Sequence, residues 1–152
     1  YFGGFFPRRE AERTELLEQL KPLDAALLFY ESPKRLASAL AAIAQAYPER
    51  EAAVCRELTK LHEEVVRDRT GELAARFAER ERAGALKGEI VIVVGGPSKR
   101  ESALDAKRAL DAARLRASEL KAEGGHTKKD IAAAIQAEFG ITRNDAYAIA
   151  IG

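Results

Sequence analysis

An unbroken run of five branched apolar residues, Ile90–Val94, constrains the fold of this chain more than any other feature. Such a run is typical of a central strand that is covered on both faces. Shorter apolar runs at residues 25–30, 52–56 and 65–69 can supply neighbouring strands. Because segments with helical spacing alternate with these runs, the sequence predicts an α/β domain whose mixed sheet has about five strands flanked by helices.

Helices are predicted where apolar residues recur every three or four positions between the strands. Residues 9–20 carry leucines on one face. Ser32 and Pro33 suit the N-cap and first turn of a second helix. Residues 71–82 form a polar amphipathic third helix. The order of elements is therefore that of a sheet with helical connections.

The sequence changes in character after a Gly-Gly-Pro-Ser segment. A long helix rich in Ala, Arg and Leu is predicted over about 101–123. The pair Thr127 and Asp130 has the spacing of a capping box and starts a helix-turn-helix-like tail. The chain is thus predicted to comprise an α/β domain, residues 1–97, and a helical extension, residues 98–152.

Charge and cysteine content exclude several classes of protein. The 25 basic and 24 acidic residues leave a net charge of +1, which is far from the strong positive field of a nucleic-acid coat protein. The single Cys55 excludes an internal disulfide, and the isolated His62 and His126 lack the spacing of zinc ligands. The longest strongly apolar run is too short to cross a membrane. We expect a cytoplasmic protein that binds neither metal nor membrane, with Cys55 as a core thiol.

Two polar clusters follow predicted strands. Residues 30–35, Tyr-Glu-Ser-Pro-Lys-Arg, lie where a strand meets a helix, the usual position of a ligand crevice in open α/β sheets. In a purely structural interpretation, Ser32 is an N-cap and the two basic residues are a solvated first turn. Residues 56–60, Arg-Glu-Leu-Thr-Lys, offer cations that suit phosphate. They could equally form surface ion pairs, which contribute about 0–1 kcal/mol.

Four motifs, in this order, resemble the C-terminal domain of the ribosomal RNA small subunit methyltransferase I family, in the tetrapyrrole-methylase fold group. They are Gly-Phe-Phe-Pro at 4–7, Phe-Tyr-Glu-Ser-Pro-Lys-Arg-Leu at 29–36, Arg-Glu-Leu-Thr-Lys at 56–60 and Lys-Gly-Glu-Ile-Val at 87–91. The resemblance implies that S-adenosylmethionine is the methyl donor. It also implies that the substrate is the ribose 2′-hydroxyl of a cytidine in 16S rRNA of the small ribosomal subunit, and that the enzyme is a homodimer.

In that family the cofactor lies between two α/β domains, and the N-terminal one carries a Gly-rich loop that contains Asp. No Gly-x-Gly-Asp element occurs here, and the chain has no Met. We therefore expect this chain to be part of a longer enzyme and to be inactive alone.

The resemblance also suggests roles for individual residues. Glu31 or Glu57 could orient or deprotonate the ribose hydroxyl. One of Phe5 and Phe6 is expected to pack in the core, while the other is free to stack on a base. Candidate cofactor-binding residues are Tyr30, Ser32, Pro33, Gly88 and Glu89, and candidate RNA-binding residues are Phe5, Arg35, Arg56, Thr59, Lys60, Lys128 and Lys129.

Two other functions remain open at this stage. The chain could be a non-catalytic RNA-binding or dimerisation module, or part of a methylase that acts on a tetrapyrrole or a diphthamide precursor. The helical tail could likewise be a packing module rather than a reader of RNA, because its basic residues are sparse.

Overall fold

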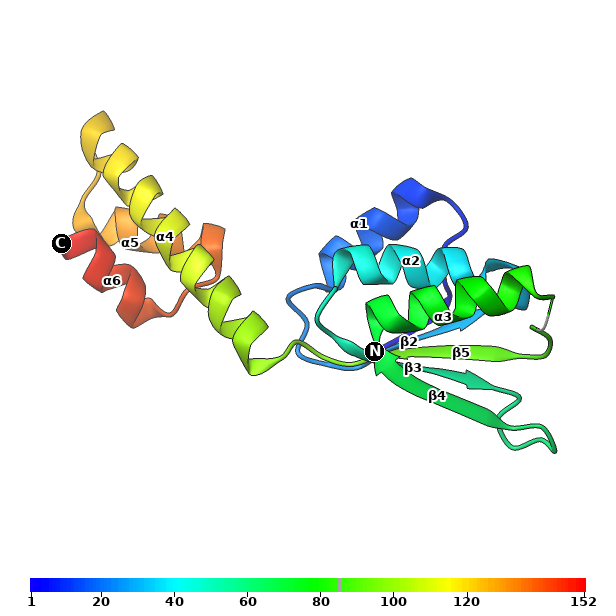
Figure 1. The fold of residues 1–152 in the computed structure, drawn as a ribbon. Helices are drawn as coiled ribbons and strands as arrows, with labels where there is room; N and C mark the ends of the chain where they lie inside the picture. Colours follow the sequence, from blue (N-terminus) through cyan, green and yellow to red (C-terminus); the bar gives the residue numbers. More distant parts are fainter. Residues whose placement is uncertain (85) are drawn as a thin grey trace. The chain divides into compact units, whose positions relative to one another are not determined.

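The computed structural model describes residues 1–84 and 86–152, which divide into two compact units, Tyr1–Ser98 and Lys99–Gly152 (Figure 1). The first unit is an α/β domain with five strands and three α-helices among its described residues. Its elements are β1 (Phe2–Phe5), α1 (Glu10–Leu20), β2 (Leu27–Glu31), the 3-10 turn η1 (Pro33–Arg35), α2 (Leu36–Ala46), β3 (Glu51–Arg56), β4 (Glu64–Arg69), α3 (Thr70–Arg82) and β5 (Ile90–Val94).

The strands form one mixed sheet in the order β1-β2-β5-β3-β4. The strand β1 is parallel to β2, whereas the other neighbouring pairs are antiparallel. The run of branched residues is the central strand β5, as predicted. The predicted α/β class with a mixed, five-stranded sheet is therefore confirmed.

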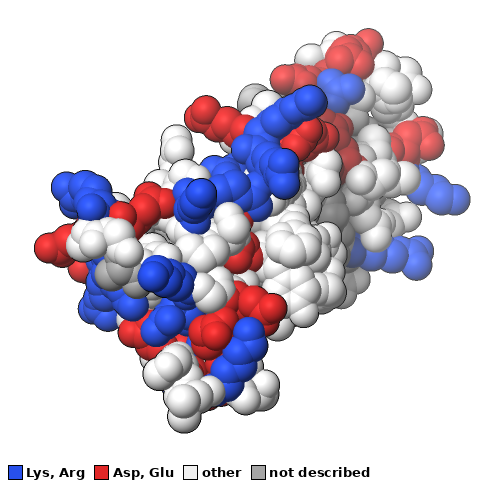
Figure 2. Space-filling model, turned by 90° about the vertical axis from the view of Figure 1, so that its right-hand side faces the viewer, with Lys and Arg blue, Asp and Glu red and all other residues white. Residues whose placement is uncertain are grey.

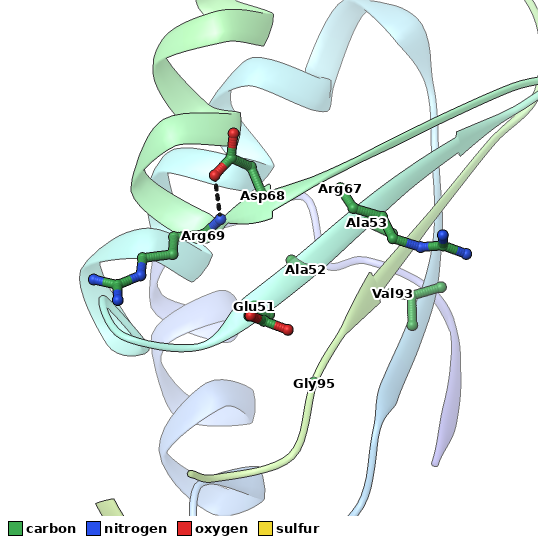
Figure 3. A pocket seen from close by; sticks show the side chains of 8 residues that line it. All are labelled: Glu51, Ala52, Ala53, Arg67, Asp68, Arg69, Val93 and Gly95. Carbon is green, nitrogen blue, oxygen red and sulfur yellow. Dashed lines mark hydrogen bonds between the residues drawn. The ribbon is translucent and has the colours of Figure 1, made fainter. Parts of the chain in front are cut away.

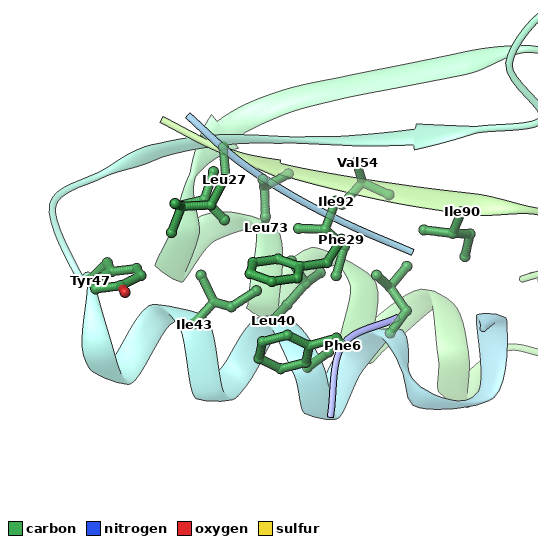
Figure 4. Close-up of a cluster of buried hydrophobic side chains, with 14 of the residues drawn as sticks. Phe6, Leu27, Phe29, Leu40, Ile43, Tyr47, Val54, Leu73, Ile90 and Ile92 are labelled. Atoms are coloured by element: carbon green, nitrogen blue, oxygen red, sulfur yellow. The ribbon is translucent and has the colours of Figure 1, made fainter. Parts of the chain in front are cut away.

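The two faces of the sheet differ, and here the prediction of cover on both faces is wrong. Ile90, Ile92 and Val94 are buried, whereas Val91 and Val93, on the opposite face, are only half-buried. Side chains alternate across a strand, and α1, α2 and α3 all lie on the same side of the sheet (Figures 1 and 4). The core therefore occupies one face only.

The core packs aromatic and aliphatic side chains of the sheet against these helices (Figure 4). The rings of Phe6 and Phe29 meet edge to face, with centroids 5.1 Å apart. Tyr47 is also buried, and its hydroxyl donates a hydrogen bond to the carbonyl of Leu17 in α1. Full burial of an apolar side chain of this size contributes roughly 1.5–3 kcal/mol, so this layer holds the sheet and helices together.

The start of the second helical segment differs from the prediction. Ser32 occupies the N-cap position of η1, but its side chain makes no capping hydrogen bond. Its backbone amide instead donates to Oε1 of Glu31, at 2.6 Å. The carboxylate of the preceding residue therefore satisfies this backbone group, and the predicted hydroxyl cap is wrong.

The second unit consists of α4 (Lys99–Glu123), α5 (Lys128–Phe139) and α6 (Arg143–Ile151) around a small core of its own. The predicted capping box of α5 is confirmed: the amide of Asp130 donates to Thr127 Oγ1 at 3.2 Å, and the Thr127 amide donates to Asp130 Oδ2 at 2.9 Å. Gly140 ends α5 with a φ of 63°. None of the helices in the described parts of the chain combines the length and apolarity needed to span a membrane.

Candidate functional site

Three of the four sequence motifs meet at one edge of the sheet, which here means the end at which the strands β2 and β3 finish and β5 begins. In the antiparallel register, Glu31 at the end of β2 and Arg56 at the end of β3 both pair with Ile90 at the start of β5. The segments 30–35 and 56–60 therefore flank the Gly88–Glu89 turn. Because β2 and β3 are both antiparallel to β5, their carboxyl ends lie at the same end of the sheet. The polar residues that follow these two strands are therefore close together, as expected.

The loop after β3 is fastened to this turn through Glu57. The Glu57 amide donates to the Glu89 carbonyl at 2.9 Å, and the Glu89 amide donates to Glu57 Oε1 at 2.7 Å. Lys60 Nζ lies 3.2 Å from the Glu57 carboxylate and 2.9 Å from that of Glu89. The Glu89 amide, followed by Lys60, lowers the pKa of Glu57, and the two carboxylates raise the pKa of Lys60.

The backbone angles of this loop explain why it depends on these hydrogen bonds and ion pairs. Glu57 and Thr59 have φ values of 52° and 66°, in the left-handed region that residues with a Cβ rarely adopt. Gly88 has a φ of 95°, and a Cβ at this position would lie 2.5 Å from Glu57 Oε1. Gly88 is therefore required by the close approach of the Glu57 side chain.

Glu31 is the buried carboxylate of the site. Its side chain is fully buried, and Oε1 accepts hydrogen bonds from the Ser32 amide and from Arg35 Nε, at 2.6 and 2.7 Å. Arg35 also donates to the carbonyl of Phe6, at 3.2 Å. The pair therefore links β2 to the segment after β1. Oε2 of Glu31 and Nη1 of Arg35 are buried without a hydrogen-bond partner in the described parts of the chain.

A second charged network involves Glu64 at the start of β4. Its carboxylate accepts from Arg80 at 2.9 Å and from Arg56 at 3.0 Å. Arg80, followed by Arg56, lowers the pKa of Glu64, although partial burial opposes this shift. Arg56 and Lys60 thus both have carboxylate partners, which reduces the positive charge available for phosphate. The partner of Arg56 is Glu64, so the expectation that it would bridge Glu57 or Glu31 is wrong.

A cavity of about 390 Å³ lies at the same edge. It brings together Phe5, Tyr30, Glu31 and Glu89 from the predicted site, together with Leu58, to which sequence reasoning assigned no role. Leu58 lies inside the charged motif and is 40% exposed, and an exposed Leu between charges is the signal that could have identified it. The complete lining is Phe5, Tyr30, Glu31, Leu58, Glu89, Ile90 and Val91.

Most of the other predicted site residues lie at the same edge but do not line this cavity. They are Ser32, Pro33, Arg35, Arg56, Glu57, Thr59, Lys60 and Gly88. Lys128 and Lys129 are exposed in the second unit, at the start of α5.

A second cavity, of about 450 Å³, opens on β3 and β4 at the far end of these strands (Figure 3). Its lining includes Arg67, an exposed cation to which sequence reasoning gave no role. Val65, Arg67 and Arg69 alternate with less exposed residues along β4. This alternation indicates that Arg67 lies on the face of the sheet that the helices do not cover.

Charged and reactive groups in the rest of the described residues do not form another candidate centre. Figure 2 shows Lys and Arg side chains interspersed with Asp and Glu rather than a field of one sign. Cys55 is buried in β3, and burial raises the pKa of its thiol, as expected of a core cysteine. Within residues 1–84 and 86–152, no three His, Cys, Asp or Glu side chains gather in a way that could hold a metal.

Comparisons with known proteins match the α/β unit to a known family. Residues 4–74 match the family model of the tetrapyrrole (corrin/porphyrin) methylases. The predicted family is confirmed: the chain belongs to the tetrapyrrole methylases, and its curated relatives are ribosomal RNA small subunit methyltransferases I.

The relative from Erythrobacter litoralis is 49% identical over 96 residues, which is 63% of this chain and 33% of that protein. The relative from Micromonospora olivasterospora is 36% identical over 147 residues, or 97% of this chain and 44% of that protein. In Bacillus subtilis the relative is 38% identical over 101 residues, or 66% and 33%. The chain thus spans between a third and a half of the length of these relatives.

Proposed function

We propose that the complete protein is an S-adenosylmethionine-dependent methyltransferase that modifies the ribose 2′-hydroxyl of a cytidine in 16S rRNA, and that this chain supplies one α/β domain of it. The observation that carries the proposal is the 49% identity to a ribosomal RNA small subunit methyltransferase I. The alignment covers 63% of the chain. Three of the motifs of this chain meet at one edge of its sheet.

The residues at this edge fit part of the cofactor. S-adenosylmethionine, when bound, supplies an activated methyl group and an adenosine. The cavity beside Tyr30 offers an aromatic wall for the adenosine, and Oε2 of Glu31 is a hydrogen-bond acceptor without a partner in the described chain. Tyr30 and Glu89 line this cavity, whereas Ser32, Pro33 and Gly88 shape the adjoining backbone.

Positioning dominates this kind of transfer, because the ribose oxygen must lie in line with the methyl group. In the proposed mechanism, Glu57 holds the loop 57–60 in place through the Glu89 amide and Lys60. Its lowered pKa makes it a weak base, which favours an orienting role over proton removal. Glu31 is buried and paired with Arg35, and this geometry likewise favours an orienting role.

The test is methyl transfer by the complete protein to small ribosomal subunits that lack the modification. We expect 2′-O-methylcytidine in the 16S rRNA by mass spectrometry of nucleosides, and we expect none when the 152-residue chain replaces the complete protein. Methylation of a base, or of an rRNA from the other subunit, would contradict the proposed substrate. Transfer by the 152-residue chain alone would contradict the proposed need for a second domain.

A further inference from the structure

A series of charged side chains connects helix α3 to the edge of the sheet where the motifs meet. Arg80 of α3 donates two hydrogen bonds to the carboxylate of Glu64, from Nη1 to Oε1 at 3.1 Å and from Nη2 to Oε2 at 2.9 Å. Glu64 Oε2 also accepts from Arg56 Nε, at 3.0 Å. Arg56 Nη1 donates in turn to the carbonyl of Lys87, at 3.4 Å. These contacts form the Arg80–Glu64–Arg56 network.

The α3 end of this network is held in a defined orientation. Arg80 binds both oxygens of Glu64, and such a bidentate pair fixes the plane of the carboxylate as well as its position. The guanidinium of Arg80 also lies over the ring of Phe77, 4.8 Å from its centroid, and Phe77 is buried in the core. The direction in which Glu64 presents its oxygens to Arg56 is therefore set by α3.

The other end of the network reaches two segments with left-handed backbone. Arg56 ends β3 and precedes Glu57, which has a φ of 52°. Lys87 precedes Gly88, which has a φ of 95°. Because one guanidinium contacts both the Glu64 carboxylate and the Lys87 carbonyl, its orientation determines how these two segments meet.

The same helix carries a second ion pair that has only a structural role to play. Arg76, one turn before Arg80, donates to Asp68 Oδ2 at 3.0 Å and also ties α3 to β4. Asp68 accepts its other described hydrogen bond from the amide of the neighbouring Arg69. The two pairs thus join the same helix to the same strand, but in the described chain the pair of Arg80 continues to Lys87 and that of Arg76 does not.

We propose that Arg80 is a positioning residue for the methyl-transfer site. Through Glu64 it orients Arg56, and Arg56 holds the loop 57–60 in register with the Gly88–Glu89 turn. The inference rests on the proposed function, in which these two segments belong to the site. Because the ribose oxygen must lie in line with the methyl group, a displacement of about 1 Å can cost on the order of 100-fold in rate.

Steady-state kinetics of the complete protein tests this role. Arg80→Ala should lower kcat about tenfold with little change in KM for S-adenosylmethionine, since positioning acts in the transition state. Arg76→Ala, which removes the matched ion pair, should leave both constants unchanged. Urea denaturation of each variant checks that it is folded. Equal kinetics of the two variants overturn the proposal, as does a rise in KM without a fall in kcat.

Two further variants test the path through Glu64. Arg80→Lys keeps the positive charge but loses the two-pronged hydrogen bond, so it should recover part of the lost rate. In a Glu64→Ala background, Arg80→Ala should lower kcat no further, because the connection is already broken. Losses that add up in the double variant overturn the path through Glu64.

Hydrogen exchange in the 152-residue chain gives a readout that does not depend on turnover. The amides of Glu57 and Glu89 are both hydrogen-bonded across the two segments. Arg80→Ala should speed their exchange about tenfold, whereas Arg76→Ala should leave it unchanged. Unchanged exchange in Arg80→Ala overturns the proposal.

The exchange and kinetic results together separate this inference from the proposed function. Normal methylation of the cytidine ribose by both the wild type and Arg80→Ala would refute the role of Arg80 alone. Methylation of a different target by the wild type, with faster exchange and slower transfer in Arg80→Ala, would refute the proposed substrate and support the role of Arg80.

Discussion

Glu57 and Glu89, 32 positions apart, are joined by a reciprocal pair of backbone and side-chain hydrogen bonds: Glu57 N to Glu89 O at 2.9 Å and Glu89 N to Glu57 Oε1 at 2.7 Å. The two carboxylates carry like charges, which repel each other unless a cation lies nearby. Here the backbone amide and Lys60 offset the repulsion, because Lys60 lies between both carboxylates. The Arg-Glu-Leu-Thr-Lys motif therefore holds the loop after β3 against the Gly88–Glu89 turn, in addition to being part of a candidate site.

Gly88→Ala should destabilise the α/β unit by about 1–3 kcal/mol. The substitution adds a Cβ at a φ of 95° and within 2.6 Å of the Glu57 side chain. Urea denaturation measures the change in the free energy of unfolding. The control is Gly71→Ala, because Gly71 lies in α3 with nothing within 4 Å of its added Cβ, and this variant should be neutral or slightly stabilised. Equal stability of the two variants would contradict the close approach at Gly88.

Phe6→Ala should cost about 3–5 kcal/mol, whereas Phe5→Ala should change the free energy of unfolding by less than about 0.5 kcal/mol. Phe6 is 1% exposed and packs on Phe29, while the neighbouring Phe5 is 72% exposed. Thermal and chemical denaturation of both variants measures the difference. A large loss for Phe5→Ala would show that the exposed ring supports the fold.

Stability should fall in acid, from about pH 5 to about pH 3, partly through Glu64. Because Arg80 and Arg56 lower the pKa of this carboxyl in the folded state, its contribution is present above its ordinary pKa. That contribution is lost as pH falls through the lowered value. Glu64→Gln should lower stability at pH 7 by up to about 1 kcal/mol and flatten the acid loss. Glu79→Gln, at an exposed position of α3, should keep the wild-type pH profile.

Thr127→Ala should destabilise the helical unit by about 1 kcal/mol, since it removes the hydroxyl that caps α5. Hydrogen exchange of the first amides of α5 reports this loss locally. Ser118→Ala provides the comparison, because Ser118 is exposed inside α4 and its hydroxyl donates to the Arg114 carbonyl of the same helix. Its exchange rates should match those of the wild type, and equal effects of the two changes would contradict the role of the cap.

Replacing both Lys128 and Lys129 by Ala in the complete protein tests whether the tail contacts rRNA. If both contact phosphate, the slope of log affinity against log salt should become shallower by about 1.4–1.8. Lys107→Ala, an exposed lysine of α4, should leave the slope unchanged. An unchanged slope for the double variant would assign the tail a packing role.

The local sequence determined the elements and the family of this protein. The apolar run Ile90–Val94 predicted the central strand, because branched residues favour buried extended backbone. The Thr127–Asp130 spacing predicted a capping box, because the hydrogen bonds of a box connect residues only three positions apart. Both features depend on neighbours in the chain, so they can be read without the fold.

Only the tertiary structure decided which side chains of the α/β unit enter its core and which residues become partners. Which of the adjacent Phe5 and Phe6 enters the core depends on the register of β1, and the cover of a single sheet face depends on where the helices pack. The roles of Glu31 and Glu57 likewise came from partners brought together by the fold. The bond between Glu57 and Glu89 exists because two antiparallel strands align 32 positions of sequence, a distance over which local propensity carries no information.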